Sequence, residues 1–219
     1  MNMKLLRPEL LITTGELDHA EWNYRPFLGW IQRLRFKAVK SLLSEVQYHR
    51  MLEVGYGSGI FMPELIRYCE ELYGIDIHRK VDEVQKALEQ VGVNAKLYSL
   101  SIESTSFPSN YFDCVVAISA LEFVHNIDAA CQEIRRILTT DGFLIVITPS
   151  YSKILDLGLK ILTGKSAILD YAGRREFLLP KLLEKFSITQ SLKVPSVIGR
   201  IVPLYNGLKL RPKHIMREP

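Results

Sequence analysis

Three glycines at alternate positions, Gly55, Gly57 and Gly59, form the part of the sequence best suited to hold a ligand. They follow an apolar stretch, Met51 to Val54, which contains the acid Glu53, and a helical pattern comes after them. A chain that turns sharply from a strand into a helix needs glycine where φ is positive or where a ligand approaches the backbone. The first turn of the helix also presents unpaired N–H groups to a polar or anionic ligand. The pattern therefore predicts a binding loop between a strand and a helix.

A second acid, Asp76, ends the next apolar stretch, 21 residues after Gly55. Alone it could cap a helix, but beside a glycine loop a carboxylate there is placed to accept hydrogen bonds from ribose hydroxyls. A dinucleotide fingerprint needs a third glycine three places after the second, and Ile60 stands at that position. Glu53 would repel a pyrophosphate, yet it suits a cofactor that carries an ammonium and a sulfonium. The residues indicate a nucleoside cofactor other than NAD.

Short β-rich runs alternate with helical patterns around this loop, as in βαβ units built on a parallel sheet. The run over residues 112–118 is almost continuously apolar, as expected of a strand buried on both faces. The pattern predicts helices over residues 33–47, 58–69, 80–91, 128–138, 154–162 and 174–186. It predicts strands over residues 51–54, 72–75, 93–98, 112–118 and 143–148, with 187–194 and 204–210 as an antiparallel edge.

Four segments together resemble the class I S-adenosylmethionine-dependent methyltransferases. Met51 to Phe61 is similar to motif I of that family, and Leu72 to Ile77 to its second motif. Phe107 to Ile118 resembles the segment that enters the fourth strand, and Glu133 to Val146 the fourth helix with the fifth strand. The resemblance keeps order and spacing over residues 35–150. It implies an enzyme, a methyltransferase whose cofactor is S-adenosylmethionine.

The same resemblance implies which residues hold the methionine and ribose parts of the cofactor. Glu53 and the backbone of Gly55 and Gly57 would line the methionine end, and Gly59 would let the helix pack closely on the strand. Asp76 would hold the ribose.

Around the adenine, the resemblance implies that Ile77 packs on the ring while Ser101 and Ile102 meet its edge. The chain departs from the family here, because Ser101 stands where an acid usually binds the adenine amino group. Glu103 is a second candidate for that contact.

The fold class that follows is α/β: a doubly wound, mostly parallel seven-stranded Rossmann-like sheet with helices on both faces and a helical cap after the fifth strand. Residues 1–32 are expected to form an N-terminal aromatic flap, and residues 33–150 the S-adenosylmethionine-binding core. Residues 151–219 would add cap helices and antiparallel edge strands to the same domain. The four aromatics of the flap are either a lid over the site or core residues of an N-terminal helix: Trp22, Tyr24, Phe27 and Trp30.

The residues that would act on the acceptor are not evident, and the catalytic residues stay unknown. Glu122 and His125 follow the fourth strand and are either a general base or a polar pair on a loop. Some relatives, such as quinone-precursor O-methyltransferases, carry a Glu-His pair here that can bind a metal. Phe123 takes the histidine place in this chain, so no metal site is expected.

The absence of two motifs narrows the range of possible methyl acceptors. Residues 118–121 read Ile-Ser-Ala-Leu in place of Asn/Asp-Pro-Pro-Tyr, which disfavours methylation of adenine or glutamine amino groups. No Pro-Cys pair is present, which disfavours a covalent cytosine mechanism, and no nucleic-acid partner is expected. The expected reaction is in-line methyl transfer to a small or amphipathic metabolite. The alternative is a non-catalytic protein that binds a nucleoside cofactor as a sensor or interaction module.

Charge is uneven along the chain. Residues 151–219 hold 13 Lys/Arg against 5 Asp/Glu, whereas residues 1–150 hold 15 against 19. The basic third either faces an anionic acceptor or membrane, or is an ordinary solvated face. Within it, residues 154–169 are either an interfacial helix or a cover over the acceptor pocket.

The expected compartment is the cytoplasm. The three cysteines have irregular spacing, which does not match a disulfide framework and suits a reducing compartment. We expect them to be small buried side chains. The alternative is a protein that contacts a membrane peripherally through residues 151–219. The sequence does not indicate the oligomeric state.

Overall fold

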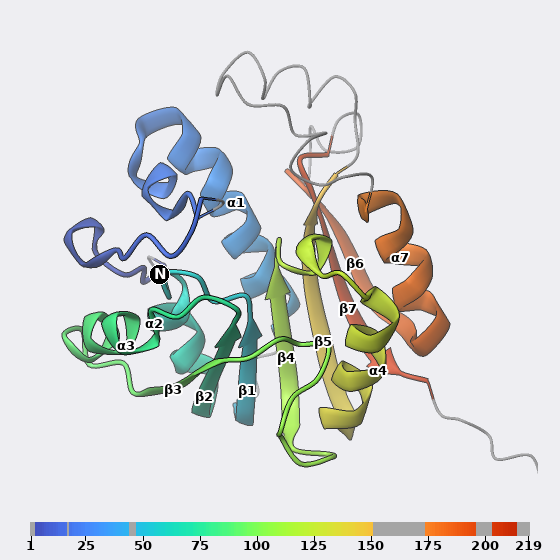
Figure 1. Ribbon diagram of the computed structural model, residues 1–219. Helices are drawn as coiled ribbons and strands as arrows, with labels where there is room; N and C mark the ends of the chain where they lie inside the picture. The colour runs from blue at the N-terminus through green and yellow to red at the C-terminus, as the bar shows by residue number, and fades with distance from the viewer. Residues whose placement is uncertain (1–2, 17, 44–46, 151–173, 196–202, 214–219) are drawn as a thin grey trace, which may run out of the picture.

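The computed structural model describes residues 3–16, 18–43, 47–150, 174–195 and 203–213. In these residues seven strands form one sheet in the order β3-β2-β1-β4-β5-β7-β6 (Figure 1). The strands are β1 (Tyr48–Val54), β2 (Cys69–Asp76), β3 (Ala95–Ser99), β4 (Phe112–Ile118), β5 (Leu138–Pro149), β6 (Phe186–Val194) and β7 (Tyr205–Pro212). Strands β1 to β5 run parallel, and β7 pairs antiparallel with both β5 and β6. The mostly parallel seven-stranded sheet is confirmed, including the antiparallel edge.

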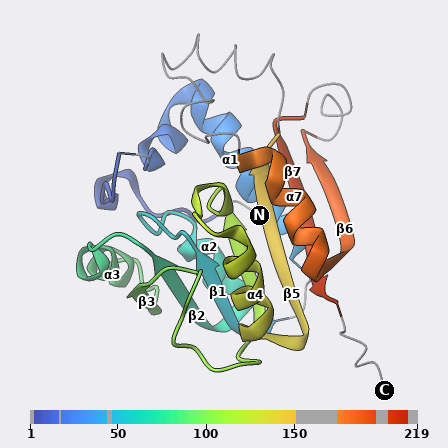
Figure 2. The same cartoon turned by 45° about the vertical axis from the view of Figure 1, so that its right-hand side comes forward.

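Helices cover both faces of the sheet (Figure 2). One face carries α1 (Pro26–Leu42), α2 (Met62–Leu65) and α3 (Val81–Glu89), and the other carries α4 (Ile127–Ile137) and α7 (Arg174–Lys185). Successive strand residues point to opposite faces, so Met51 packs in the first layer and Leu52 in the second. Both side chains are fully buried. This two-sided burial explains why the central strands read as continuous apolar runs.

The N-terminal segment crosses the first helical layer before α1 begins. It contains two short 3-10 helices, η1 (Pro8–Leu10) and η2 (Ala20–Tyr24). Leu6 is fully buried, and its N–H donates to the Ile60 carbonyl at 3.0 Å. The Tyr24 hydroxyl donates to the Leu6 carbonyl. These contacts attach the segment to the chain that follows the glycine loop.

Two predicted helices have the wrong bounds. Helix α1 begins at Pro26 and not at residue 33, because proline fits the first helical position, where no N–H partner is needed. It ends at Leu42 and not at residue 47, since the backbone of Leu43 is already extended. The helix expected from residue 58 to 69 is much shorter: α2 spans Met62–Leu65, and η3 (Ile66–Tyr68) follows it. A helix begun at Ser58 would have placed Pro63 in its interior, where the missing N–H costs a hydrogen bond.

The cysteines agree with expectation. The three cysteines, Cys69, Cys114 and Cys131, are buried and free. Within the described ranges no helix is long and apolar enough to span a bilayer. Of the helices expected after the fifth strand, the one at residues 154–162 lies outside the described residues, and the one at residues 174–186 is α7, which packs beside α4.

Candidate cofactor site

The glycine loop has the backbone geometry that its sequence predicts. Gly55, Gly57 and Gly59 all have positive φ, at +74°, +51° and +69°. The Gly55 N–H donates to the Ile75 carbonyl at 2.8 Å, which extends the β1–β2 pairing into the loop. A Cβ at Gly55 would lie 2.6 Å from the Cβ of Ala120. The loop therefore needs glycine both for its conformation and for its close approach to the end of β4.

The loop lies where the strand order reverses. Strand β1 pairs with β2 on one side and β4 on the other, so the carboxyl ends of these three strands surround the glycines. Ligands of open α/β sheets bind in the crevice at such a point. The Asp76 carboxylate, at the end of β2, accepts the Gly57 N–H at 2.9 Å through Oδ2. His78 Nε2 lies 3.1 Å from the Gly57 carbonyl.

Glu53 is a buried acid in the middle of this arrangement. It is 4% exposed, and its Oε2 atom has no hydrogen-bond partner in the described part of the chain. Burial raises the pKa of Glu53 to about 8; the neighbouring Asp76 adds to the rise and Arg35 opposes it. A buried carboxylate is costly unless a cation or donor meets it. The site is therefore suited to a ligand that brings a positive charge to Glu53.

On the far side of Asp76 the site becomes apolar. Ile77 is 79% exposed and Ile102 is 4% exposed. An exposed isoleucine next to Asp76 offers a flat aromatic ring a surface to pack on. Ser101 is exposed, and its Oγ accepts the Glu103 N–H at 3.2 Å.

Glu103 has a structural role through one of its two carboxylate oxygens. Its Oε1 accepts the backbone N–H groups of His125 and Asn126 at 2.9 and 3.1 Å. Asn126 in turn caps α4 by accepting the Ala129 N–H at 3.0 Å. Glu103 therefore fixes the loop before α4 through Oε1, and its contact with the adenine amino group stays a prediction.

The N-terminal segment reaches the glycine loop, which the sequence alone did not reveal. The atoms nearest to a Cβ built at Gly57 belong to Asp18 and Thr14, at 3.9 Å. Asp18 Oδ2 accepts both the N–H and the hydroxyl of Thr14, and the Lys80 ammonium donates to the Thr13 carbonyl at 2.7 Å. A buried acid of α2 holds the start of the segment, because Glu64 Oε2 accepts the Lys4 N–H at 2.7 Å. The only sequence signal for these contacts was the presence of short polar residues before α1.

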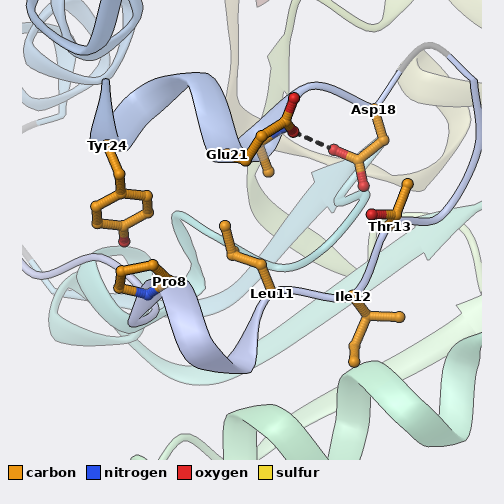
Figure 3. Close-up of a pocket in the computed structure, with 8 residues that line it drawn as sticks. Pro8, Leu11, Ile12, Thr13, Asp18, Glu21 and Tyr24 are labelled. Atoms are coloured by element: carbon orange, nitrogen blue, oxygen red, sulfur yellow. Dashed lines mark hydrogen bonds between the residues drawn. The ribbon is translucent and has the colours of Figure 1, made fainter. Parts of the chain in front are cut away.

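A small cavity of about 180 Å³ is lined by residues of this segment (Figure 3). Asp18 and Thr13 stand at one end of it, and Tyr24 and Pro8 at the other. The aromatic flap divides in two: Trp22 stacks on His19, whereas Phe27 and Trp30 are 60% and 46% exposed. The short polar residues Thr14 and Asp18, and not these aromatics, are nearest to Gly57.

The residues after β4 do not identify a catalytic group. Glu122 is 1% exposed within η4 (Leu121–Phe123), against which α7 packs. His125 lies on the loop that Glu103 fixes. Ser119, just beyond the strand, has a positive φ of 52°. In the described ranges no group of three or more His, Cys, Asp or Glu is placed to hold a metal.

Part of the chain is similar to a known family. Residues 52–146, which include the glycine loop and Asp76, match the model described as "Methyltransferase domain". These residues form a methyltransferase domain, and the sheet edge described above is the candidate site for its cofactor, S-adenosylmethionine.

Two curated relatives are similar to parts of this chain. An uncharacterised methyltransferase YcgJ of Bacillus subtilis is 32% identical over 101 residues, which are 45% of this chain and 40% of that protein. A ubiquinone biosynthesis O-methyltransferase of Bartonella bacilliformis is 24% identical over 214 residues, covering 86% of each. The chain thus spans less than half the length of the first relative and most of the second.

A solved structure shares the fold. The N-methyltransferase NodS of Bradyrhizobium japonicum, determined with S-adenosyl-L-homocysteine, superposes with a TM-score of 0.64. It is 16% identical, and the match covers 92% of the present chain and 95% of that one. At this identity the likeness concerns the fold alone.

Proposed function

We propose that this methyltransferase transfers the methyl group of S-adenosylmethionine, in line, to a small or amphipathic metabolite. The observation that carries the proposal is the buried carboxylate of Glu53, whose Oε2 has no hydrogen-bond partner in the described chain. Glu53 is two residues before Gly55, the first glycine of the loop, and burial raises the pKa of Glu53 to about 8. An acid in that state gains most from a ligand that carries an ammonium group.

The residues present fit the cofactor from one end to the other. Glu53 would receive the ammonium, and the positive-φ backbone at Gly55 and Gly57 would let the methionine part come close. Asp76 would accept the ribose hydroxyls through the oxygen that Gly57 does not use. Gly59 would keep the loop packed on α3, because a Cβ there would lie 3.1 Å from Val84.

The adenine would lie between an exposed and a buried apolar side chain. Ile77 would cover one face of the ring, and Ile102 with Ser101 would border its edge. Because Ser101 replaces the usual acid, recognition of the adenine amino group would be weaker in this chain than in its family.

The chemistry needs little from the protein beyond placement. When bound, S-adenosylmethionine supplies a methyl group on a positively charged sulfur that leaves as a neutral thioether, so no general acid is required. The side chains bind, orient and exclude water, and holding the acceptor at near-attack distance can supply most of the acceleration. An oxygen or nitrogen acceptor can additionally need a base, and no residue is assigned to that role.

The proposed acceptor class follows from the sequence motifs and from one relative. A small or lipid-like acceptor is supported by the missing nucleic-acid motifs and by the relative named for ubiquinone biosynthesis. We also propose that residues 151–219 cover the acceptor, since the chain after β5 leaves at the carboxyl edge of the sheet. Several cations of this third are already used within the protein, however: Lys181 pairs with Asp128 at 3.0 Å, and Lys209 and Arg211 lie over the Phe143 ring.

Two measurements test the proposal in sequence. Calorimetric titration of one sample with S-adenosylmethionine, its demethylated product and NADH should give binding of the first two only. Transfer of a labelled methyl group to fractionated small-molecule and lipid extracts should then yield a labelled product. Binding without transfer to any fraction would favour the cofactor-sensing alternative, and NADH binding alone would overturn the cofactor assignment.

A further inference from the structure

One face of α1 carries a row of cations next to an exposed tryptophan. Trp30, Arg33, Lys37 and Lys40 follow one another at spacings of three, four and three residues, which places them along one side of the helix. Trp30 is 46% exposed, and Phe27 at the start of the helix is 60% exposed. The row therefore combines a cationic surface with aromatic side chains that are left open to solvent.

The N-terminal segment runs beside this row and makes a groove with it. The groove encloses about 830 Å³, and Arg7 adds a fourth cation from the opposite wall. Met3 and Leu5 supply apolar surface, while Tyr24 and Ser41 contribute hydroxyl groups. No aspartate or glutamate is among the described residues that line it. Such a lining favours a ligand with a negatively charged head and an apolar body.

Two of the four cations have roles within the protein. Arg33 donates to the Asn23 carbonyl at 2.6 Å, which holds η2 against α1. Lys40 pairs with the buried Glu64 at 2.7 Å. Arg7 and Lys37 are exposed, and no ion pair joins either of them to an acid in the described chain. The groove thus keeps two cations free for an anion from outside.

We propose that this groove binds the anionic headgroups of phospholipids and so attaches the α1 face to an anionic membrane surface. Phosphate groups would meet Arg7, Lys37 and the outer parts of Arg33 and Lys40. The first methylenes of the lipid would contact Met3 and Leu5, and Trp30 would enter the interface, where tryptophan is favoured. Basic side chains with neighbouring aromatics are the pattern of interfacial helices.

The site is separate from the cofactor site, and the inference does not depend on methyl transfer. None of its lining residues belongs to the glycine loop or to the Asp76 edge. It also differs from the membrane contact expected at residues 151–219, because the cations belong to the N-terminal 41 residues. If the methyl acceptor is lipid-like, the groove would bring the protein to the membrane in which the acceptor is dissolved.

The test uses the full chain and vesicles of phosphatidylglycerol mixed into phosphatidylcholine, with pure phosphatidylcholine vesicles and inorganic phosphate as comparison ligands. Arg7→Gln/Lys37→Gln should lower the partition coefficient roughly thirtyfold, about 1 kcal/mol for each cation removed. The control Lys86→Gln/Lys193→Gln removes the same charge from exposed positions on α3 and β6, and should change it less than about threefold. Unchanged calorimetric binding of S-adenosylmethionine and an unchanged melting temperature would show that each variant folds.

A second readout follows the tryptophan. Trp22→Phe leaves Trp30 as the single tryptophan of a chain that has two. Its emission should shift to the blue on anionic vesicles and stay unchanged on phosphatidylcholine. The proposal would be overturned if the protein did not bind the vesicles, or if the two double variants lost the same amount of vesicle binding. It would also be overturned if the Trp30 emission did not shift in the bound protein. Binding of inorganic phosphate at Arg7 and Lys37 without vesicle binding would overturn the lipid as its source.

Discussion

The Asp76 carboxylate accepts the backbone N–H of Gly57 at 2.9 Å, so the acid at the end of β2 holds the glycine loop that follows β1. The bond uses Oδ2, while among the described residues Oδ1 accepts only the His78 N–H at a long 3.4 Å. A carboxylate has about four acceptor positions, so Asp76 keeps capacity for a diol. The residue thus has two roles that can be separated by substitution: it orders the loop and it offers an acceptor.

Substitution of Asp76 should weaken cofactor binding strongly. Asp76→Ala removes a charge-assisted acceptor worth about 1.5–3 kcal/mol, so the dissociation constant for S-adenosylmethionine should rise roughly ten- to a hundredfold. Asp76→Asn keeps an oxygen that can accept the Gly57 N–H, and should lose only part of the affinity. Calorimetric titration measures both.

An exposed acid of α3 serves as the matched control for Asp76. Asp82→Ala removes the same charge at a position away from the ribose edge and should leave the affinity within about twofold. Equal affinity in Asp76→Ala and in the unaltered protein would show that Asp76 only orders the loop.

The cofactor affinity should depend on pH through Glu53. In the free protein burial raises its pKa to about 8, so below that pH the acid is mostly protonated. An ammonium ligand needs the ionised form and must displace the proton. Affinity should therefore rise with pH, by up to about tenfold per unit, until pH 8 is reached. Above about pH 8 the α-amino group of the ligand loses its own proton and the gain stops.

Glu53→Gln gives the contrast for this pH dependence. The amide has nearly the same shape but no charge, so binding should be weak and nearly independent of pH between 6 and about 8. Titrations of both proteins across this range, in buffers of equal ionic strength, measure the slopes. A steep slope retained in the glutamine variant would assign the proton to another group, and the assignment of the ammonium to Glu53 would fail.

The close approach of the glycine loop to β4 can be tested with a matched glycine. Gly55 and Gly92 both have φ of +74°, so alanine at either costs about 1–2 kcal/mol of backbone strain. Only at Gly55 does the added Cβ meet another atom, the Ala120 Cβ at 2.6 Å, because the space around Gly92 is open. Gly55→Ala should therefore lower the melting temperature more than Gly92→Ala, and it alone should impair cofactor binding.

A compensating change completes this comparison. Ala120→Gly removes the atom that the new Cβ would strike, so Gly55→Ala/Ala120→Gly should regain part of the lost stability and binding. Thermal melts and titrations of the four proteins give the coupling between the two positions. Additive losses in the double variant would mean that the backbone strain, and not the approach to β4, requires the glycine.

The core of the fold could be predicted because its signals are local. The run over residues 112–118 is apolar at nearly every position, and it became β4 with the predicted bounds. The glycines at alternate positions predicted the positive φ values at Gly55, Gly57 and Gly59. Each of these features depends on neighbours within a few residues, which a single sequence displays directly.

The contacts that were missed join parts of the chain far apart in sequence. Glu64 receives the Lys4 N–H from 60 residues away and pairs with Lys40 of α1, although its own neighbours in sequence are ordinary helix residues. Burial works to raise the pKa of Glu64, but the bonds from Lys4, Lys40 and Arg67 outweigh it and lower the pKa. The basic groove escaped notice for a similar reason, because Arg7 becomes its fourth cation only once the chain has folded.

The last prediction concerns the loop that carries Ser101 and Ile102. Glu133 of α4 holds this loop, because its Oε1 accepts the N–H and the hydroxyl of Thr105 at 2.8 and 2.6 Å. Arg136 binds both Glu133 oxygens and also donates to the Phe107 carbonyl at 2.7 Å. Hydrogen bonds from Arg136 first, and from Thr105 second, lower the pKa of Glu133 to about 2.

A lowered carboxyl pKa contributes stability above the unfolded value of 4.5, and this contribution disappears as pH falls from there towards 2. Glu133→Gln should therefore cost about 2–3 kcal/mol of unfolding free energy at pH 7, less whatever solvent screening removes at the partly exposed Arg136. At about pH 3 the difference should shrink to about two fifths of that value. Urea unfolding at both pH values measures it, with Asp82→Asn as an exposed carboxylate that should change little at either. A deficit in Glu133→Gln that stays constant from pH 7 to pH 3 would show that its packing, and not its charge, holds the loop.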